Sequence, residues 1–153
     1  MNDTVLILNG PNLNLLGERE PHIYGYETLA DIKGRCVERA KANGLEIDFR
    51  QSNFEGDLIE SVHEARNKFK AIIINPAGLT YTSISLLDAF KSFEGLKIEV
   101  HLANPHRRES YYSESLIAKI ADVVISGMGS DGYVLSLEHV RNKLDAMAQV
   151  SRK

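Results

Sequence analysis

Arg19 and Tyr24 lie close together in a long polar segment after the first apolar run of the chain, and they are candidates for a proton-abstracting pair. A phenol with its ordinary pKa of about 10 is a poor base at neutral pH. A nearby guanidinium stabilises the phenolate, and arginine stays charged throughout the physiological range. The pair therefore indicates acid–base chemistry, although on spacing alone Tyr24 is equally compatible with an ordinary half-buried aromatic residue.

His101 ends another apolar run, where an imidazole can give or take a proton near neutral pH. Glu99 lies two residues earlier, so in a strand it points to the same face and can orient the imidazole. A histidine in a strand is more often simply packed, but the end of a strand favours a functional interpretation. We expect His63 and His139 to lie on exposed faces of helices. His22 and His106 lie in loops, and their function is left open.

Asn12 and Asn75 can each donate and accept hydrogen bonds, which suits holding a water molecule or a substrate hydroxyl. Capping of a turn is the alternative for both, because asparagine does this well. Hydroxyl residues follow Asn75 and predict the start of a helix whose free amides offer a place for an anion: Thr80, Thr82 and Ser83.

These residues follow short apolar runs that are typical of buried parallel strands. The pattern predicts strands at 5–8, 45–50, 71–74, 98–102 and 123–125. Helical spacing predicts helices at 29–40, 57–69 and 131–148, with further helices in the remaining crossovers, including that between the fourth and fifth strands. Such alternation predicts an α/β fold with three layers and a five-stranded parallel sheet, whose ligands bind at the carboxyl ends of the strands.

The segment 9–26 is longer than the two to six residues that usually connect a strand to a helix. Connections of this length in a compact domain are often functional. Bends and hinge points are available at three glycines and two prolines: Gly10, Gly17, Gly25, Pro11 and Pro21. We therefore expect this segment to be an active-site lid, with a surface excursion of no consequence as the alternative.

The composition is that of one globular domain spanning 1–153, with 43% hydrophobic and 25% charged residues. A net charge of −3 with scattered basic residues argues against a nucleic-acid partner. Cys36 is the single cysteine, which excludes an intramolecular disulfide and fits a reducing compartment. The apolar runs are too short to span a membrane. We expect a cytoplasmic protein that binds neither membranes nor nucleic acid.

Several long motifs occur in a fixed order: NGPNLNLLG at 9–17, REPxxYG at 19–25, QSNxEG at 51–56, TxTS at 80–83, EVH at 99–101 and GxGxxGY at 127–133. Together they resemble the type II dehydroquinases, the 3-dehydroquinate dehydratases of the shikimate and quinate pathways, nearly from end to end. The resemblance implies a flavodoxin-like fold, no cofactor or metal, and a dodecamer built from four trimers.

It also implies a hydro-lyase that removes water from a cyclic β-hydroxy-ketone such as 3-dehydroquinate and yields 3-dehydroshikimate. A tyrosinate, matched by Tyr24, takes a proton next to the ketone to form an enolate, and His101 protonates the leaving hydroxyl. Arg19 would activate the tyrosine, Asn12 would hold a water against the enolate oxygen, and Glu99 would orient His101. The resemblance also places Asn75, Leu102 and Arg108 around the substrate. It implies that Asp88 reaches the site of a neighbouring subunit.

The chain departs from the family pattern at four positions. Tyr81 replaces a histidine, Ala103 a serine, Tyr112 an arginine, and Leu87 an arginine. In the family the side chains at positions 81, 103 and 112 bind the carboxylate and ring hydroxyls of the substrate. Replacing them should therefore change which substrate the site recognises. The expectation is the same type of dehydration, with impaired activity on 3-dehydroquinate or a preference for a related cyclic hydroxy-ketone. The alternative is a plain dehydroquinase with neutral changes.

A flavodoxin-like sheet is also compatible with proteins of other classes. A flavin carrier needs small hydroxyl residues after the first strand, but 9–17 contains none. A phosphorylation receiver needs an aspartate where Asn75 stands. The late GxGxxG follows the last strand and indicates a turn. A catalytically weak binding protein remains the non-enzyme alternative, and retention of the acid–base residues argues against it.

Overall fold

The computed structural model describes residues 3–112 and 114–152, and its centre is a five-stranded parallel sheet. The strands are β1 (Asp3–Asn9), β2 (Leu45–Gln51), β3 (Ala71–Asn75), β4 (Leu96–His101) and β5 (Val123–Ser126). They lie in the order β2-β1-β3-β4-β5, and every neighbouring pair is parallel. This is the flavodoxin-like order. The predicted sheet is confirmed.

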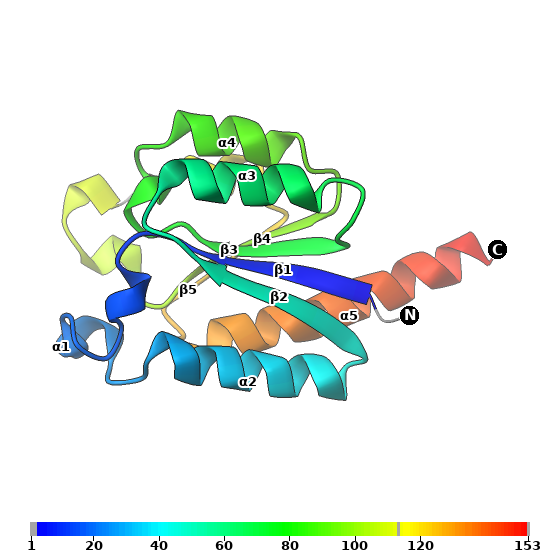
Figure 1. Cartoon of the computed structure of the whole chain (residues 1–153), viewed down its shortest axis with the longest axis horizontal. Coiled ribbons are helices and arrows are strands. Elements are labelled where there is room, and N and C mark those ends of the chain that lie inside the picture. Colours follow the sequence, from blue (N-terminus) through cyan, green and yellow to red (C-terminus); the bar gives the residue numbers. More distant parts are fainter. Residues whose placement is uncertain (1–2, 113, 153) are drawn as a thin grey trace.

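Helices cover both faces of the sheet (Figure 1). α2 (Leu29–Ala42) and α5 (Asp131–Ser151) lie on one face, and α3 (Glu55–Ala65) and α4 (Ile84–Lys91) lie on the other. The three layers predicted from the alternating pattern are therefore present. None of the helices in the described ranges is both long and apolar enough to cross a membrane.

The core has two halves because each strand sends alternate side chains to opposite faces. Val5 and Ile7 of β1 pack with residues of α2 and α5, whereas Leu6 and Leu8 pack with residues of α3 and α4. All four are fully buried. Burial on both faces explains why the strand is a continuous apolar run rather than an alternating one.

Helix boundaries follow local capping. Thr28 and Asp31 form a reciprocal capping box at the start of α2. At the start of α4, Ser83 Oγ accepts a hydrogen bond from the amide of Leu86 at 2.9 Å, so Ser83 is the predicted cap. The prediction for α3 was wrong at its end: the helix stops at Ala65, because the chain turns at Asn67 with φ 61°.

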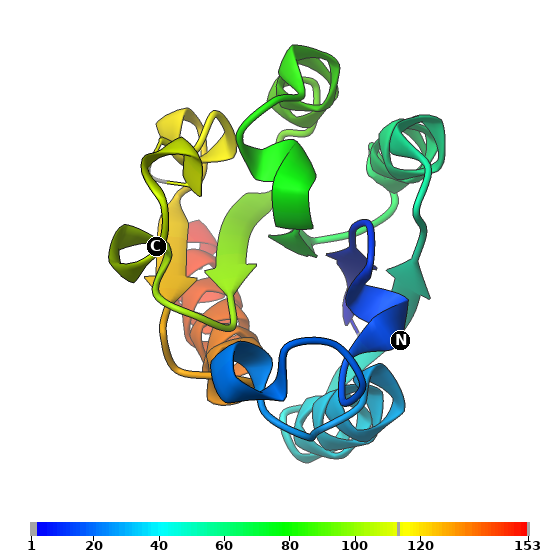
Figure 2. The same cartoon turned by 90° about the vertical axis from the view of Figure 1, so that its left-hand side faces the viewer.

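The connection from β4 to β5 contains no α-helix in its described residues, 102–112 and 114–122, which contradicts the predicted crossover helix. It consists of three short 3₁₀ turns, η3 (Pro105–Arg107), η4 (Ser110–Tyr112) and η5 (Ile117–Lys119). Asn104 accepts a hydrogen bond from the amide of His106 through its side chain, and this turn competes with helix formation. These turns surround the carboxyl ends of the strands together with η2 (Ala77–Thr80) and α1 (Pro21–Tyr24) (Figure 2).

Candidate active site

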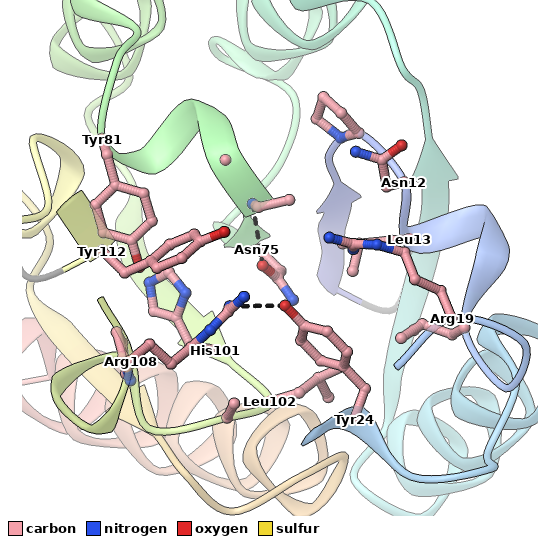
Figure 3. Close-up of a pocket in the computed structure, with 16 residues that line it drawn as sticks. Asn12, Leu13, Arg19, Tyr24, Asn75, Tyr81, His101, Leu102, Arg108 and Tyr112 are labelled. Atoms are coloured by element: carbon pink, nitrogen blue, oxygen red, sulfur yellow. Dashed lines mark hydrogen bonds between the residues drawn. The ribbon is translucent and has the colours of Figure 1, made fainter. Parts of the chain in front are cut away.

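A cavity of about 180 Å³ lies at the carboxyl edge of the sheet, next to β1, β3 and β4 (Figure 3). The strand order reverses between β1 and β3, and parallel sheets bind ligands at such points. The cavity brings together most of the residues that the sequence singled out. Its polar lining includes Asn12, Arg19, Tyr24, Asn75, Tyr81, His101, Arg108 and Tyr112.

A buried hydrogen-bond network fixes the side chains at the ends of β1 and β3. The Tyr133 hydroxyl donates to Asn9 Oδ1 at 2.7 Å and accepts from Asn75 Nδ2 at 3.2 Å. Asn75 Oδ1 accepts from the amide of Ala77 at 3.2 Å. Burial raises the pKa of Tyr133, so its hydroxyl stays protonated. Sequence reasoning missed this role, because Tyr133 belongs to a distant helix and was noted only as part of a motif.

The long segment after β1 is tied to the sheet edge at its start. Gly10 donates its amide hydrogen to Asn75 O at 2.8 Å. A Cβ on Gly10 would lie 2.4 Å from the carbonyl oxygen of Pro76, so only glycine fits there. Leu13 and Leu16 are each only 5% exposed and pack in the core. The segment therefore rests on the core instead of extending freely into solvent.

Tyr24 ends α1, and its phenol meets two guanidinium groups. Arg108 Nη1 donates to Tyr24 Oη at 2.7 Å. The guanidinium carbons of Arg108 and Arg19 lie 5.4 Å and 5.6 Å from the centre of the tyrosine ring. The Tyr24 phenol therefore lies beside two cationic side chains that come from different segments of the chain.

Arg108, and not Arg19, makes the hydrogen bond to the Tyr24 hydroxyl (Figure 3). The sequence pointed to Arg19 as the activating residue and expected Arg108 only to contact substrate. The two bonded residues are 84 positions apart in the chain, so spacing carried no signal for this contact. Arg19 remains near the ring and lines the same cavity.

His101 is supported from behind by a buried carboxylate. His101 Nε2 lies 3.1 Å from Glu99 Oε2, and the Glu99 side chain is 1% exposed. The other carboxylate oxygen accepts a hydrogen bond from Ser115 Oγ, which itself accepts from the amide of Ala118. Because Nε2 faces Glu99, Nδ1 is the ring nitrogen left for a ligand. Sequence reasoning found the pair but missed Ser115.

Two of the residues that depart from the family pattern form one aromatic wall of the cavity. Tyr81 stacks on His101 with ring centres 6.4 Å apart, and Tyr112 meets Tyr81 edge to face at 5.5 Å. Burial, with a smaller contribution from Glu99, raises the pKa of Tyr81 to about 12, so this phenol is neutral near pH 7. Ala103 lies in the same lining.

The other expected substrate residues are placed differently. Leu102 lines the cavity, whereas Asp88 lies outside it on α4. Asp88 is exposed and forms an ion pair with Lys91 at 3.7 Å. Within one chain, therefore, the structure does not bring Asp88 to the site.

The remaining histidines do not line this cavity. His63 is exposed, as expected, and so are His22 and His106. The expectation of a fully solvated face was wrong for His139, because it is half-buried and its Nε2 has no hydrogen-bond partner among the described residues. Its helix, α5, packs against α2 and against β3, β4 and β5.

Across residues 3–112 and 114–152, no group of three or more His, Cys, Asp or Glu side chains is arranged to hold a metal ion. The cavity instead combines a phenol held by a guanidinium, an imidazole held by a carboxylate, and amide groups. Such a set at the carboxyl edge of a parallel sheet defines an α/β protein equipped for proton transfer.

Comparison with known proteins identifies the family. The family model described as dehydroquinase class II matches residues 3–141. The 3-dehydroquinate dehydratase of Cereibacter sphaeroides is 49% identical over 140 residues, which cover 92% of this chain and 95% of that one. The 3-dehydroquinate dehydratase 2 of Pseudomonas putida is 49% identical over 148 residues, covering 97% and 99%. The crystal structure of type II dehydroquinase from Propionibacterium acnes matches with a TM-score of 0.90 at 34% identity, covering 93% and 98%.

The chain belongs to the class II dehydroquinase family. Identity close to one half covers nearly the full length of both chains. The resemblance seen in the sequence motifs is confirmed.

Proposed function

We propose that this protein is a hydro-lyase that dehydrates 3-dehydroquinate to 3-dehydroshikimate, with Tyr24 as the base and His101 as the acid. The support comes from the family and from one geometric observation. The Tyr24 hydroxyl, held by Arg108 at 2.7 Å, lines the same cavity as His101, which is backed by Glu99. A base and an acid are thus available in one small space.

In the first step, the Tyr24 phenolate removes a proton from the carbon next to the substrate ketone. The electron pair of the broken C–H bond moves to the ketone oxygen and forms an enolate. Asn12, at the cavity edge, would hold a water molecule that donates to this oxygen. Arg108 and Arg19 would place their guanidinium groups beside this base.

In the second step, the enolate collapses and expels the β-hydroxyl group. His101 gives that oxygen a proton, so the leaving group departs as water and the product carries a new carbon–carbon double bond. Glu99 stabilises the imidazolium form and holds the ring in place. A proton then passes from Tyr24 to His101 through solvent, which restores both groups.

Replacement of Tyr24 by phenylalanine tests the proposed base. We expect Tyr24→Phe to lower kcat by about 10²- to 10⁴-fold without unfolding the protein, because the hydroxyl that accepts the proton is lost. Conversion of 3-dehydroquinate can be followed by the absorbance of the conjugated product. Tyr26→Phe is the matched control, since Tyr26 is 80% exposed. Equal turnover by wild type and Tyr24→Phe would refute the assignment.

A second candidate keeps the chemistry and changes the substrate. The observation in its favour is the aromatic wall of Tyr81 and Tyr112, which offers two ring faces and, at Tyr81, a neutral hydroxyl on one side of the cavity. A different cyclic β-hydroxy-ketone, lacking the carboxylate or the ring diol, would suit such a wall. A panel of these ketones, assayed beside 3-dehydroquinate, separates the candidates. Ordinary efficiency on 3-dehydroquinate would exclude the second.

The proposal extends to assembly, mobility and location. We infer a dodecamer of four trimers, in which exposed Asp88 reaches the site of a neighbouring subunit.

Residues 9–26 would act as a lid that bends at Gly17 and Gly25, where φ is 91° and 81°. The buried, unpaired thiol of Cys36 suits a reducing compartment, in line with a cytoplasmic enzyme.

A further inference from the structure

The guanidinium of Arg108 is held by few hydrogen bonds for a side chain that is only 17% exposed. Nη1 donates to Tyr24 Oη. Nη2 lies 4.0 Å from Glu20 Oε2, beyond hydrogen-bond distance, and buried Nε has no hydrogen-bond partner among the described residues. Among the described residues, therefore, the side-chain hydrogen bond to Tyr24 is the only one that holds this guanidinium.

Aromatic rings provide the missing restraint. The guanidinium carbon of Arg108 lies 3.8 Å from the centre of the Tyr112 ring, which is stacking distance, and 5.4 Å from the centre of the Tyr24 ring. The guanidinium thus lies between two aromatic side chains that are far apart in the sequence (Figure 3).

The Tyr112 ring is itself braced. It meets Tyr81 edge to face at 5.5 Å and Tyr111 at 4.5 Å, and its amide donates to Glu109 O at 2.9 Å. Tyr81 in turn stacks on His101. Because these contacts hold the Tyr112 ring in place, the ring can restrict the movement of the Arg108 side chain that packs against it.

From this geometry we propose that Tyr112 is a positioning residue, whose ring face holds Arg108 against the hydroxyl of Tyr24. The catalytic consequence rests on the proposed function, in which Tyr24 is the base. The contact of the Tyr112 ring with Arg108, called the clamp below, does not depend on the proposed function, because its effect on Tyr24 can be measured without substrate. It also gives Tyr112 a function in a chain where the family has arginine at this position.

Several ionisable groups besides Arg108 surround Tyr24, and a test must separate their effects. Arg19 and Glu20 come from its own segment, and His22 borders the cleft on the other side of its ring. Across the cavity stand two further groups, Tyr81 and His101. A change at Tyr112 that acts through Arg108 must therefore vanish when Arg108 is removed.

The experiment is a pH titration of Tyr24 by NMR, using protein labelled with ¹³C at the tyrosine ring carbon that bears the hydroxyl. The chain has six tyrosines, and the Tyr24 signal is identified by its loss in Tyr24→Phe. We expect Tyr112→Leu to move the titration midpoint of Tyr24 upward by about half a pH unit to one unit, because the cation is held less firmly. Tyr112→Phe keeps the ring face and should titrate like wild type.

Arg108→Met provides the background for the decisive comparison. With Arg108→Met already present, Tyr112→Leu should cause no further change in the midpoint. An unchanged midpoint in Tyr112→Leu would overturn the clamp. An equal shift in Tyr112→Phe, or a shift that persists in the Arg108→Met background, would overturn it too. Thermal unfolding of each variant checks the fold. A midpoint shift without dehydration of 3-dehydroquinate would uphold the clamp and count against the proposed function.

Discussion

At the scale of single residues, the contacts that prepare the site join parts of the chain that are far apart. Arg108 and Tyr24 are separated by 84 positions, and Tyr133 and Asn9 by 124. Sequence reasoning identified the reactive residue types, because strand ends and rare motifs mark them. It could not pair them correctly, because a hydrogen bond between distant segments leaves no local pattern.

The two arginines can be separated by the pH dependence of kcat/KM. A cation beside a phenol favours the ionised form of the phenol. With Tyr24 as the proposed base, removing such a cation should move the acid limb to higher pH. Because Arg108 donates directly to the hydroxyl, we expect Arg108→Met to move that limb by roughly one to two pH units, and Arg19→Met by less. A larger shift in Arg19→Met would restore Arg19 as the main activator, as the sequence suggested.

At the scale of elements, hydrophobic periodicity located all five strands and the long helices to within a few residues. It failed in the β4–β5 connection, where side-chain turns produced 3₁₀ segments instead of a helix. That failure matters for function, because this connection carries Arg108, Tyr112 and Ser115 to the site. Periodicity reports burial against the sheet, and segments that line a cavity have no such regular burial.

Gly10 tests how tightly the segment after β1 must approach the sheet. Gly10→Ala places a methyl group 2.4 Å from the Pro76 carbonyl oxygen, so we expect about 1–3 kcal/mol of lost stability and a lower kcat. Urea unfolding and the dehydration assay measure the two effects. Gly34→Ala is the matched control: its helical position has open space, so it should gain up to about 1 kcal/mol. Wild-type stability in Gly10→Ala would contradict the close approach.

At the scale of the whole molecule, the order β2-β1-β3-β4-β5 brings the ends of β1, β3 and β4 together at one edge. Motifs from the beginning and the middle of the chain thereby share one cavity. Asp88 is the exception, since it lies on α4 away from this cavity and exposed. Its expected function therefore depends on assembly with other copies.

Replacing Asp88 tests that dependence. If the residue completes a neighbouring site, Asp88→Asn should lower kcat/KM by about tenfold while the assembled mass measured by light scattering stays that of a dodecamer. Lys91→Gln is the matched control, because it breaks the same ion pair and keeps the carboxylate. Full activity in Asp88→Asn, or a monomeric mass, would remove Asp88 from the site.

The sequence by itself determined the α/β class, the parallel sheet, the family and the candidate base and acid, because burial periodicity and ordered motifs are local properties of the chain. Tertiary structure alone decided which cation touches Tyr24, what orients Asn75, and what Tyr112 contacts. These are distances between side chains from different crossovers, and they are set by strand order and loop conformation, which local patterns do not encode. For the same reason Tyr112, known from sequence only as a lost arginine, became the ring that holds Arg108.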